Sequence, residues 1–315
     1  MVSMRAVIVA KFGDPGVLTV AEIPTPEPSP GQVRVKVAAA GVNPVDSYNV
    51  QDPSWAGVEL GCTPGYDIAG TVDAVGTGLD SSLVGRKVMA MTAFPRGQGG
   101  YAEFAAVDES LVAYLNDDAD VLAAAAIPLA AGTAWEVIER VKAEGTALLV
   151  IGASGGVGLF ALQLASLAGL RPVALGRSRS HELMRTYGAA HCIDYTEPDA
   201  ARRAAEVAGG SFDAIADLTG GPLTMAAQPF LRDDGVICAI APPELDADPL
   251  IDGNQSFHGI LIRDNGHRMR ELGALFNTGR LTAHVSHTLP LERAAEAHQL
   301  LSSGEAGGKI VLTVT

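Results

Sequence analysis

Residues 148–158, with the sequence Leu-Leu-Val-Ile-Gly-Ala-Ser-Gly-Gly-Val-Gly, constrain the fold of this chain more than any other stretch. The four apolar residues are typical of a strand buried on both faces, and the glycines that follow are typical of a tight turn. Residues 159–165 then have the pattern of a helix that packs on a sheet. The free N–H groups and the dipole at such a helix start bind phosphate. Gly155 would let the backbone approach a pyrophosphate, and Gly158 would let helix and strand pack closely.

The fingerprint is A-x-G-x-x-G, because Ala153 stands where the first glycine usually falls. We therefore predict a dinucleotide site formed by Ala153, Ser154, Gly155, Gly156, Val157 and Gly158; the alternative is a tight turn without a ligand.

Strands and helices alternate along the chain after this corner. Short apolar runs separated by helical stretches indicate a parallel sheet with helices on both faces. The expected strands are residues 147–151, 172–175, 191–193, 213–217, 236–240 and 260–262, and the expected helices include residues 180–187, 200–208 and 223–230.

The first hundred residues are instead rich in expected β-strands. Residues 32–37 alternate strictly between polar and apolar, as a half-buried strand does. Further strands are expected at residues 6–10, 18–21, 71–75, 87–91 and 102–107, and helices at 118–126 and 132–140. After residue 265 we expect a helix to residue 277, a strand at 281–287, a helix at 291–302 and a last strand at 309–314. The predicted fold class is therefore α/β, with a doubly wound parallel sheet beside a β-rich part.

Composition bounds the classes of partner. The chain has 315 residues and a net charge of −14, from 22 basic and 36 acidic residues, which argues against nucleic acid or an anionic membrane as a partner. The three cysteines, at positions 62, 192 and 238, make a disulfide framework unexpected and favour a cytoplasmic location. The apolar stretch at residues 121–131 is interrupted by Pro128 and is too short to span a bilayer, and the N-terminal apolar run is too short for a signal peptide.

Five further motifs occur in order along the chain: Gly-Val-Asn-Pro-Val-Asp at 41–46, Pro-Gly-Tyr-Asp-Ile-Ala-Gly-Thr-Val at 64–72, Gly-Gly-Tyr-Ala-Glu-Phe at 99–104, Ala-Gly-Thr-Ala-Trp at 131–135 and Gly-Lys-Ile-Val-Leu at 308–312. Together with the glycine turn, they resemble the medium-chain dehydrogenase/reductase superfamily, specifically its zinc-free quinone oxidoreductase (zeta-crystallin-like) branch. The resemblance covers nearly the whole chain. It implies a GroES-like substrate domain at residues 1–117, completed by residues 265–315, and a Rossmann dinucleotide-binding domain at residues 118–264.

The same motifs bear on metal binding. Zinc-dependent members of the superfamily place cysteine, histidine and glutamate here, whereas this chain has Asn43 for the first cysteine and Tyr66-Asp67 for the histidine–glutamate pair. A tetrahedral zinc needs three or four converging ligands, and no C-x-x-C pair occurs. We therefore expect no metal. Without a Lewis acid, reduction of a quinone or an activated C=C is easier to support than oxidation of an alcohol.

The end of the second Rossmann strand distinguishes the two nicotinamide cofactors. An acidic residue there binds the ribose of NAD, whereas arginine accommodates the extra phosphate of NADP. Gly176 occupies the position of the acid, and Arg177, Ser178 and Arg179 follow. Guanidinium groups bind phosphate bidentately, so we predict NADPH; the alternative is a solvated helix start with Ser180 as N-cap.

By the resemblance, several side chains lie near cofactor or substrate. Tyr195 matches a family tyrosine near the adenosine, with packing as its alternative. Thr133 is expected beneath the nicotinamide, or else to cap a helix. Asn43 and Tyr48 match polar residues of the quinone reductase pocket, and we predict both as catalytic. Tyr48 would donate a hydrogen bond to the substrate oxygen, with packing an equal alternative, while Asn-Pro is also a turn signal.

These expectations define an NADPH-dependent oxidoreductase that transfers hydride to a quinone or to the activated C=C of an α,β-unsaturated carbonyl without metal. One alternative is a trans-acting enoyl-thioester reductase of polyketide or fatty-acid type, for which Arg96 is an isolated basic candidate. Another is a non-catalytic, crystallin-like NADPH-binding protein. The expected partners are a small-molecule substrate and a second copy of the chain, because residues 257–262 form an apolar strand candidate at a sheet edge.

Overall fold

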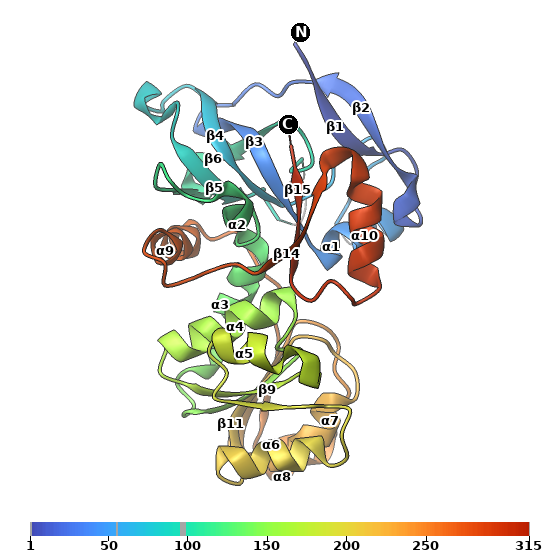
Figure 1. The fold of residues 1–315 in the computed structure, drawn as a ribbon, viewed down its shortest axis with the longest axis vertical. Coiled ribbons are helices and arrows are strands. Elements are labelled where there is room, and N and C mark those ends of the chain that lie inside the picture. Colours follow the sequence, from blue (N-terminus) through green and yellow to red (C-terminus); the bar gives the residue numbers. More distant parts are fainter. Residues whose placement is uncertain (1, 55, 95–98, 315) are drawn as a thin grey trace. The chain divides into compact units, whose positions relative to one another are not determined.

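The computed structural model describes residues 2–54, 56–94 and 99–314, which form two compact units. The first unit consists of Met1–Gly132 with Arg263–Thr315, and the second of Thr133–Ile262. Figure 1 shows that the second unit is built from one continuous segment, while the first takes both ends of the chain.

A seven-stranded sheet with the path β14-β15-β3-β4-β5-β7 and β6 paired to β3 forms the frame of the first unit. The expected strand at residues 32–37 lies within its longest member, whose Val33, Val35 and Val37 side chains are buried. Strand β15 pairs antiparallel with β3, so the end of the chain completes a sheet that begins near its start. The strands are β3 (Gln32–Val42), β4 (Asp67–Val75), β5 (Lys87–Met91), β6 (Phe104–Asp108), β7 (Val112–Tyr114), β14 (Val285–Pro290) and β15 (Lys309–Thr313), beside a hairpin of β1 (Ser3–Val9) and β2 (Leu18–Pro24).

Helices of the first unit are α1 (Pro44–Gln51), α2 (Val121–Ala125), α9 (Gly266–Asn277) and α10 (Ala294–Ser302). The short α2 packs on β3 and β4, which is why this unit continues to Gly132 and does not stop at residue 117. A Cβ atom at Gly41 would lie 2.3 Å from the carbonyl oxygen of Ala125, so only glycine permits this approach of helix to strand. Helix α3 (Pro128–Val141) crosses the boundary between the two units.

The second unit contains a six-stranded sheet with the order β10-β9-β8-β11-β12-β13, in which every neighbouring pair is parallel. The chain runs outward from β8 through β9 to β10, then returns to β11 on the other side of β8. This reversal is the topological switch point of a doubly wound fold. The strands are β8 (Ala147–Ile151), β9 (Arg171–Leu175), β10 (His191–Ile193), β11 (Phe212–Asp217), β12 (Leu231–Ala239) and β13 (Ser256–Gly259).

Helices cover both faces of this sheet, as the alternation of elements predicts. Figure 1 shows α4 (Gly156–Leu167) and α5 (His181–Thr186) on one face and α6 (Ala200–Ala208) and α7 (Leu223–Ala227) on the other, with α8 (Ala247–Asp252) beyond them. The core beneath α6 and α7 is apolar throughout and includes Leu149, Ile151, Val173, Leu175, Phe212 and Ile215. The α/β fold class is thus confirmed.

Two expectations about individual elements were wrong, and one helix was not predicted. The strand expected at residues 260–262 ends at Gly259, because its partner β12 ends at Ala239, opposite that residue. The strand expected at 281–287 is β14, which begins at Val285. Helix α1 was not predicted because Asn-Pro signals a turn; here Pro44 takes the first helical position and Asn43 with Asp46 forms a capping box.

Among the described residues, none of the helices is long and apolar enough to cross a membrane.

Candidate functional site

The glycine turn joins β8 to α4 at the switch point of the parallel sheet. Gly152 has a φ of +79°, so it supplies the left-handed residue of the turn, and buried Ala153 is tolerated at the next position. A Cβ atom at Gly158 would lie 2.3 Å from the carbonyl oxygen of Gly152, which explains the glycine there. Gly155 is the N-cap of α4 and provides no side-chain cap. The first N–H groups of α4 are therefore not capped by that residue and are suited to an anion.

The loop after β9 lies directly beside this turn. The N–H of Ala153 donates to the carbonyl of Leu175 over 3.3 Å, and a Cβ atom on Gly176 would lie 3.6 Å from Ser154 Oγ. Arg177 and Arg179 are exposed. The fold thus brings together two stretches that the sequence analysis assigned to the cofactor, 153–158 and 177–179.

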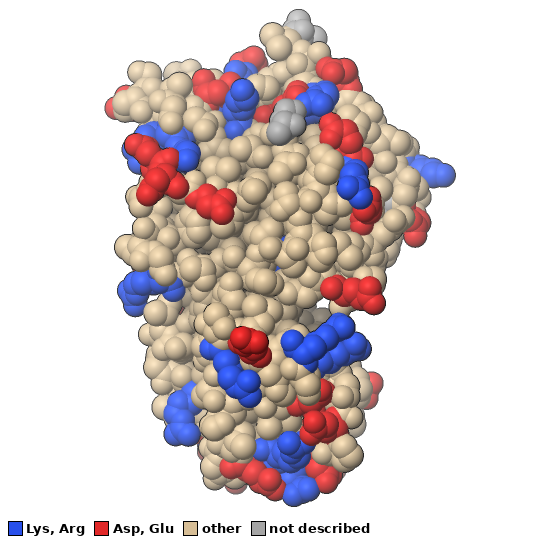
Figure 2. All heavy atoms as spheres, viewed as in Figure 1, with Lys and Arg blue, Asp and Glu red and all other residues tan. Residues whose placement is uncertain are grey.

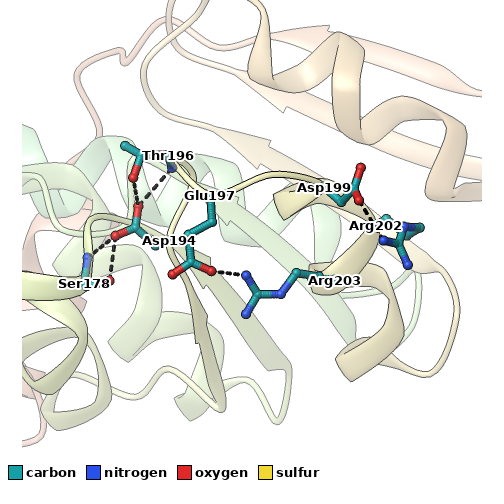
Figure 3. Close-up of polar contacts among 7 residues, drawn as sticks. All are labelled: Ser178, Asp194, Thr196, Glu197, Asp199, Arg202 and Arg203. Carbon is teal, nitrogen blue, oxygen red and sulfur yellow. Dashed lines mark hydrogen bonds and ion pairs between the residues drawn. The ribbon is translucent and has the colours of Figure 1, made fainter.

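Ser178 has a partner that the sequence did not indicate. Its N–H and its hydroxyl both donate to Asp194 Oδ2, over 2.7 and 2.6 Å, and the N–H and hydroxyl of Thr196 donate to Oδ1 over 2.9 and 2.7 Å (Figure 3). These bonds, that of the Ser178 hydroxyl above all, hold the pKa of the Asp194 carboxyl well below its usual range. Next to it, Arg177 Nε donates to the Tyr195 hydroxyl over 3.0 Å.

A pocket of about 400 Å³ opens at the carboxyl ends of β9 and β10. Tyr195 lines it, and Leu175, Leu223 and Phe230 give it an apolar wall. Charged side chains at its rim come from the loop after β10 and from α6: Glu197, Asp199 and Arg202. Figure 3 shows Glu197 paired with Arg203, and Asp199 with Arg202. The sequence analysis missed this rim, although its position directly after an expected parallel strand was a usable signal.

Thr133 lies in the interior of α3, which begins at Pro128, so the alternative in which it caps a helix does not hold. It is buried. Its proximity to a nicotinamide stays a prediction. The candidate Arg96 lies outside the described residues.

Asn43 and Tyr48 both belong to the α1 region of the first unit, but their environments differ. Tyr48 is 59% exposed, whereas Asn43 is 2% exposed. Asn43 Nδ2 donates to Asp67 Oδ2 over 2.9 Å, and its Oδ1 accepts from Lys309 Nζ over 2.5 Å. The Asn43 amide is therefore held by protein groups on both sides, whereas the ring of Tyr48 is open to solvent.

Lys309 places a cation among these buried groups. Its ammonium donates to the carbonyl of Val42 over 3.0 Å and lies 3.6 Å from Asp67 Oδ2. Burial lowers the pKa of Lys309 and raises that of Asp67, while the attraction between them opposes both shifts. The pair compensates two charges that would each be costly to bury alone.

A second buried cluster adjoins the first. Asp46 Oδ2 accepts from the N–H of Asn43 and from the Tyr101 hydroxyl, over 2.8 and 2.9 Å. Tyr101 also contacts His298 Nε2 at 3.2 Å, and His298 Nδ1 lies 2.9 Å from Ser47 Oγ. Burial raises the pKa of Asp46 to about 7 and lowers that of His298 to about 4. Two buried carboxyls, Asp46 and Asp67, thus lie near one ammonium, and burial raises the pKa of both.

These donors do not fit a zinc ion. Asn43, Tyr66 and Asp67 stand where the zinc-dependent members of the superfamily have metal ligands, and they present an amide, a phenol and a carboxylate. Each is engaged: Asn43 by Asp67 and Lys309, and the Tyr66 hydroxyl by Asn49 Nδ2 over 2.7 Å. In the part of the chain that the structure describes, no three His, Cys, Asp or Glu side chains form a group that could hold a metal ion. The buried ammonium would also repel a divalent cation.

A doubly wound parallel sheet with a glycine turn at its switch point defines a dinucleotide-binding α/β protein. Residues 29–117 match the family of the alcohol dehydrogenase GroES-like domain, and residues 187–312 that of the zinc-binding dehydrogenases. The chain is 30% identical to the quinone oxidoreductase of Sus scrofa, over 98% of this chain and 97% of that protein. It is also 30% identical to the chloroplastic NADPH-dependent alkenal/one oxidoreductase of Arabidopsis thaliana, over 98% of this chain and 79% of that protein.

Solved structures agree with these relatives. A mycobacterial protein complexed with NADPH has a TM-score of 0.85 and 30% identity, with 99% of this chain and 100% of that chain covered. The chain therefore belongs to the medium-chain dehydrogenase/reductase superfamily, in its quinone oxidoreductase branch, and is an oxidoreductase of a nicotinamide-dinucleotide-dependent family.

The raised pKa of Asp46 generates a prediction about stability. A carboxyl whose pKa rises from its ordinary value of 3.8 to about 7 in the folded protein favours folding only while it is protonated. That contribution is complete below about pH 4 and is lost as the pH rises to about 7. The side chain of Asp46→Asn cannot ionise. The free energy of unfolding of this variant, relative to that of the unmodified protein, should therefore increase by roughly 4 kcal/mol between pH 4 and 7. Urea denaturation across that range measures the difference.

The exposed Asp118 offers the matched control, because Asp118→Asn removes a carboxyl that water already solvates. A gap between the unmodified protein and Asp46→Asn that does not change with pH would contradict the assignment.

Proposed function

We propose that this protein is an NADPH-dependent oxidoreductase that transfers hydride, without a metal, to a quinone or to the activated C=C of an α,β-unsaturated carbonyl. The observation that carries the proposal is the buried Lys309 ammonium between Asn43 and Asp67, at positions that hold zinc ligands in metal-dependent relatives. In this proposal the engaged side chains leave no ligands for a Lewis acid that would stabilise an alkoxide. Acceptors whose reduction produces an enolate or a hydroquinone anion need only hydrogen-bond donors.

Cofactor and substrate would be held by different elements. NADPH supplies the hydride when bound, and the glycine turn, with the N–H groups at the start of α4, would bind its pyrophosphate. The adenosine would lie in the pocket lined by Tyr195. Tyr48 is the proposed hydrogen-bond donor to the substrate oxygen. Asn43 was also predicted as catalytic, but its amide is engaged by Asp67 and Lys309, so we propose that it shapes the start of α1.

The class of substrate and the location of the protein complete the proposal. Figure 2 shows acidic and basic side chains in small mixed groups among large uncharged areas on the face drawn, which supports a small-molecule substrate over nucleic acid or an anionic membrane. We further propose a cytoplasmic location, in keeping with free thiols at Cys62, Cys192 and Cys238. The enoyl-thioester reductase is the alternative activity, and an activity panel separates it from the proposed one.

Arginine recognition of the extra phosphate predicts a cofactor preference. The unmodified protein should bind NADPH more tightly than NADH, and replacing Arg177 and Arg179 together by alanine should remove most of that preference. The loss should reach about 1.5–3 kcal/mol per charged contact, because a phosphate left without its partners loses charge-assisted hydrogen bonds. Titration calorimetry with each cofactor measures it. Arg171→Ala, on the amino-terminal end of β9, is the control. Equal affinities in the unmodified protein would refute NADPH specificity.

Tyr48 generates a prediction about catalysis. Negative charge builds on the substrate oxygen after hydride transfer, and one well-placed donor there is worth roughly 2.7–4 kcal/mol. Tyr48→Phe should therefore lower kcat by a factor of about 100 or more while cofactor affinity stays unchanged. NADPH oxidation followed at 340 nm over quinones, enals, enones and enoyl thioesters, with and without a zinc chelator, provides the readout. Tyr114→Phe, which removes a hydroxyl that donates to Glu109, is the control.

The outcomes of this panel divide the hypotheses. An unchanged kcat for Tyr48→Phe would remove Tyr48 from the mechanism. Activity abolished by the chelator and restored by zinc would overturn the metal-free proposal. Turnover confined to thioesters would favour the enoyl-thioester reductase, and turnover of no substrate in the panel would contradict the proposed reaction.

The edge of the parallel sheet supports a homodimer. Among the strands that the structure describes, β13 pairs only with β12. Phe257 on β13 and Leu261 just after it are 41% and 50% exposed and line a hollow of about 500 Å³. An apolar sheet edge of this kind suits pairing with a second copy. Light scattering at micromolar concentration should give twice the chain mass, and Leu261→Asp should shift it toward the monomer, whereas Val84→Asp, 47% exposed in the other unit, should not. A monomeric unmodified protein would contradict the dimer.

A further inference from the structure

Asp194 connects the loops that follow two neighbouring parallel strands. It is the first residue after β10, and its Oδ2 accepts both the N–H and the hydroxyl of Ser178, in the loop after β9. Its Oδ1 is engaged by the N–H and hydroxyl of Thr196 on its own loop. Figure 3 shows the carboxylate between these two residues. All four bonds are 2.9 Å or shorter, so both oxygens are firmly held.

These bonds change how the arginine loop can recognise a phosphate. Both donors of Ser178 are directed at Asp194, so Ser178 serves the loop's conformation, and the sequence-based expectation that it binds cofactor is better replaced by a positioning role. Arg177 and Arg179 flank it and are exposed. A second link joins the adjacent residues, because Arg177 Nε donates to the Tyr195 hydroxyl. The arginine loop is thus attached to the next loop at two successive residues.

We propose that Asp194 is a positioning residue for cofactor selection, which fixes the loop of Arg177 and Arg179 in the conformation that receives the extra phosphate of NADPH. This inference rests on the proposed function, in which NADPH is the cofactor. Ser178 mediates the effect, since it is the residue between the two arginines. The carboxylate itself does not contact the cofactor in this proposal.

The sign of the effect separates positioning from simple electrostatics. Asp194 is negatively charged at neutral pH, because its hydrogen bonds hold its pKa low. If it acted on the phosphate only through its charge, removing that charge would strengthen NADPH binding, since like charges repel. If it positions the arginines, removing it releases the loop and weakens NADPH binding. NADH lacks the extra phosphate, so its affinity should change little in either case.

The test compares dissociation constants of NADPH and NADH for the unmodified protein and four variants. Asp194→Ala should lower the preference for NADPH by about tenfold or more, the value of one charge-assisted hydrogen bond, with NADH affinity nearly unchanged. Asp194→Asn and Ser178→Ala should lower it by less, since each retains part of the link. Thr196→Val is the matched control: it also deletes one hydroxyl bond to Asp194, but on the oxygen that does not hold the arginine loop, and should leave the preference unchanged.

Hydrogen–deuterium exchange checks the attachment without any cofactor. Exchange in residues 176–180 should accelerate in Asp194→Ala and stay unchanged in Thr196→Val. If Asp194→Ala does not fold, Asp194→Asn and Ser178→Ala carry the comparison, and a lower preference in both supports the proposal.

Each adverse outcome has a distinct meaning. Equal affinities of the unmodified protein for the two cofactors would overturn the proposed cofactor and this inference with it. A clear preference that persists or increases in the Asp194 variants would overturn only the inference. If the Asp194 variants lost affinity for NADPH and NADH equally and had a lower melting temperature, the role of Asp194 would be purely structural. That result would overturn the inference as well.

Discussion

The packing of the first unit depends on the hydrogen bonds and the ion pair that the Asp67 carboxylate makes. Its Oδ1 accepts from the N–H of Leu129 over 2.7 Å, and its Oδ2 accepts from Asn43 and lies beside the Lys309 ammonium. One side chain on β4 therefore joins the start of α1, the start of α3 and the last strand. Gly41 lies opposite Asp67 in the β3–β4 register, where a larger residue would meet both this carboxylate and α2. Removing either charge of the pair would leave the other buried without compensation, which is far more destabilising than losing both.

This arrangement limits the chemistry that the first unit can support. Both polar atoms of the Asn43 amide and both oxygens of Asp67 already have protein partners, so the fold positions these two side chains and they are not available as ligands. The side chain of Tyr48, about one and a half turns along the same helix, is exposed, which is why the proposal assigns it the contact with a substrate. A proton-donating or hydrogen-bonding role suits hydride acceptors that become oxyanions, and this is why the proposed reaction is a reduction of a conjugated acceptor.

The sequence predicted those parts of the fold that local patterns determine. The glycine turn and the alternation of apolar runs with helical stretches located β8, β9 and β11, because strands buried on both faces are largely apolar. The apolar pattern located only the second half of β12, since its first half carries Arg232, Asp233 and Asp234. The apolar run at 257–262 gave no such guide to where β13 ends, since the end is set by the partner strand β12. Neither could a local pattern reveal Lys309 beside Asn43, which are 266 positions apart. The same limit applies to Ser178: its hydroxyl suggested a phosphate donor, but a carboxylate 16 positions away engages it.

The acidic composition of the chain also has a local explanation in the second unit. Asp217, at the end of β11, accepts from the N–H and hydroxyl of Thr219, the N–H of Gly220 and the hydroxyl of Thr224. Asp194 fixes the loops after β9 and β10 in the same manner. Parallel strands end at one edge of the sheet, so loops there need donors and acceptors that the ladder no longer provides, and a short carboxylate satisfies several N–H groups at once. Such carboxylates count in the net charge of −14, yet their hydrogen bonds point inward to the protein. The overall charge is therefore a poor guide to what a ligand meets at this edge, where Arg177 and Arg179 are exposed on the loop after β9.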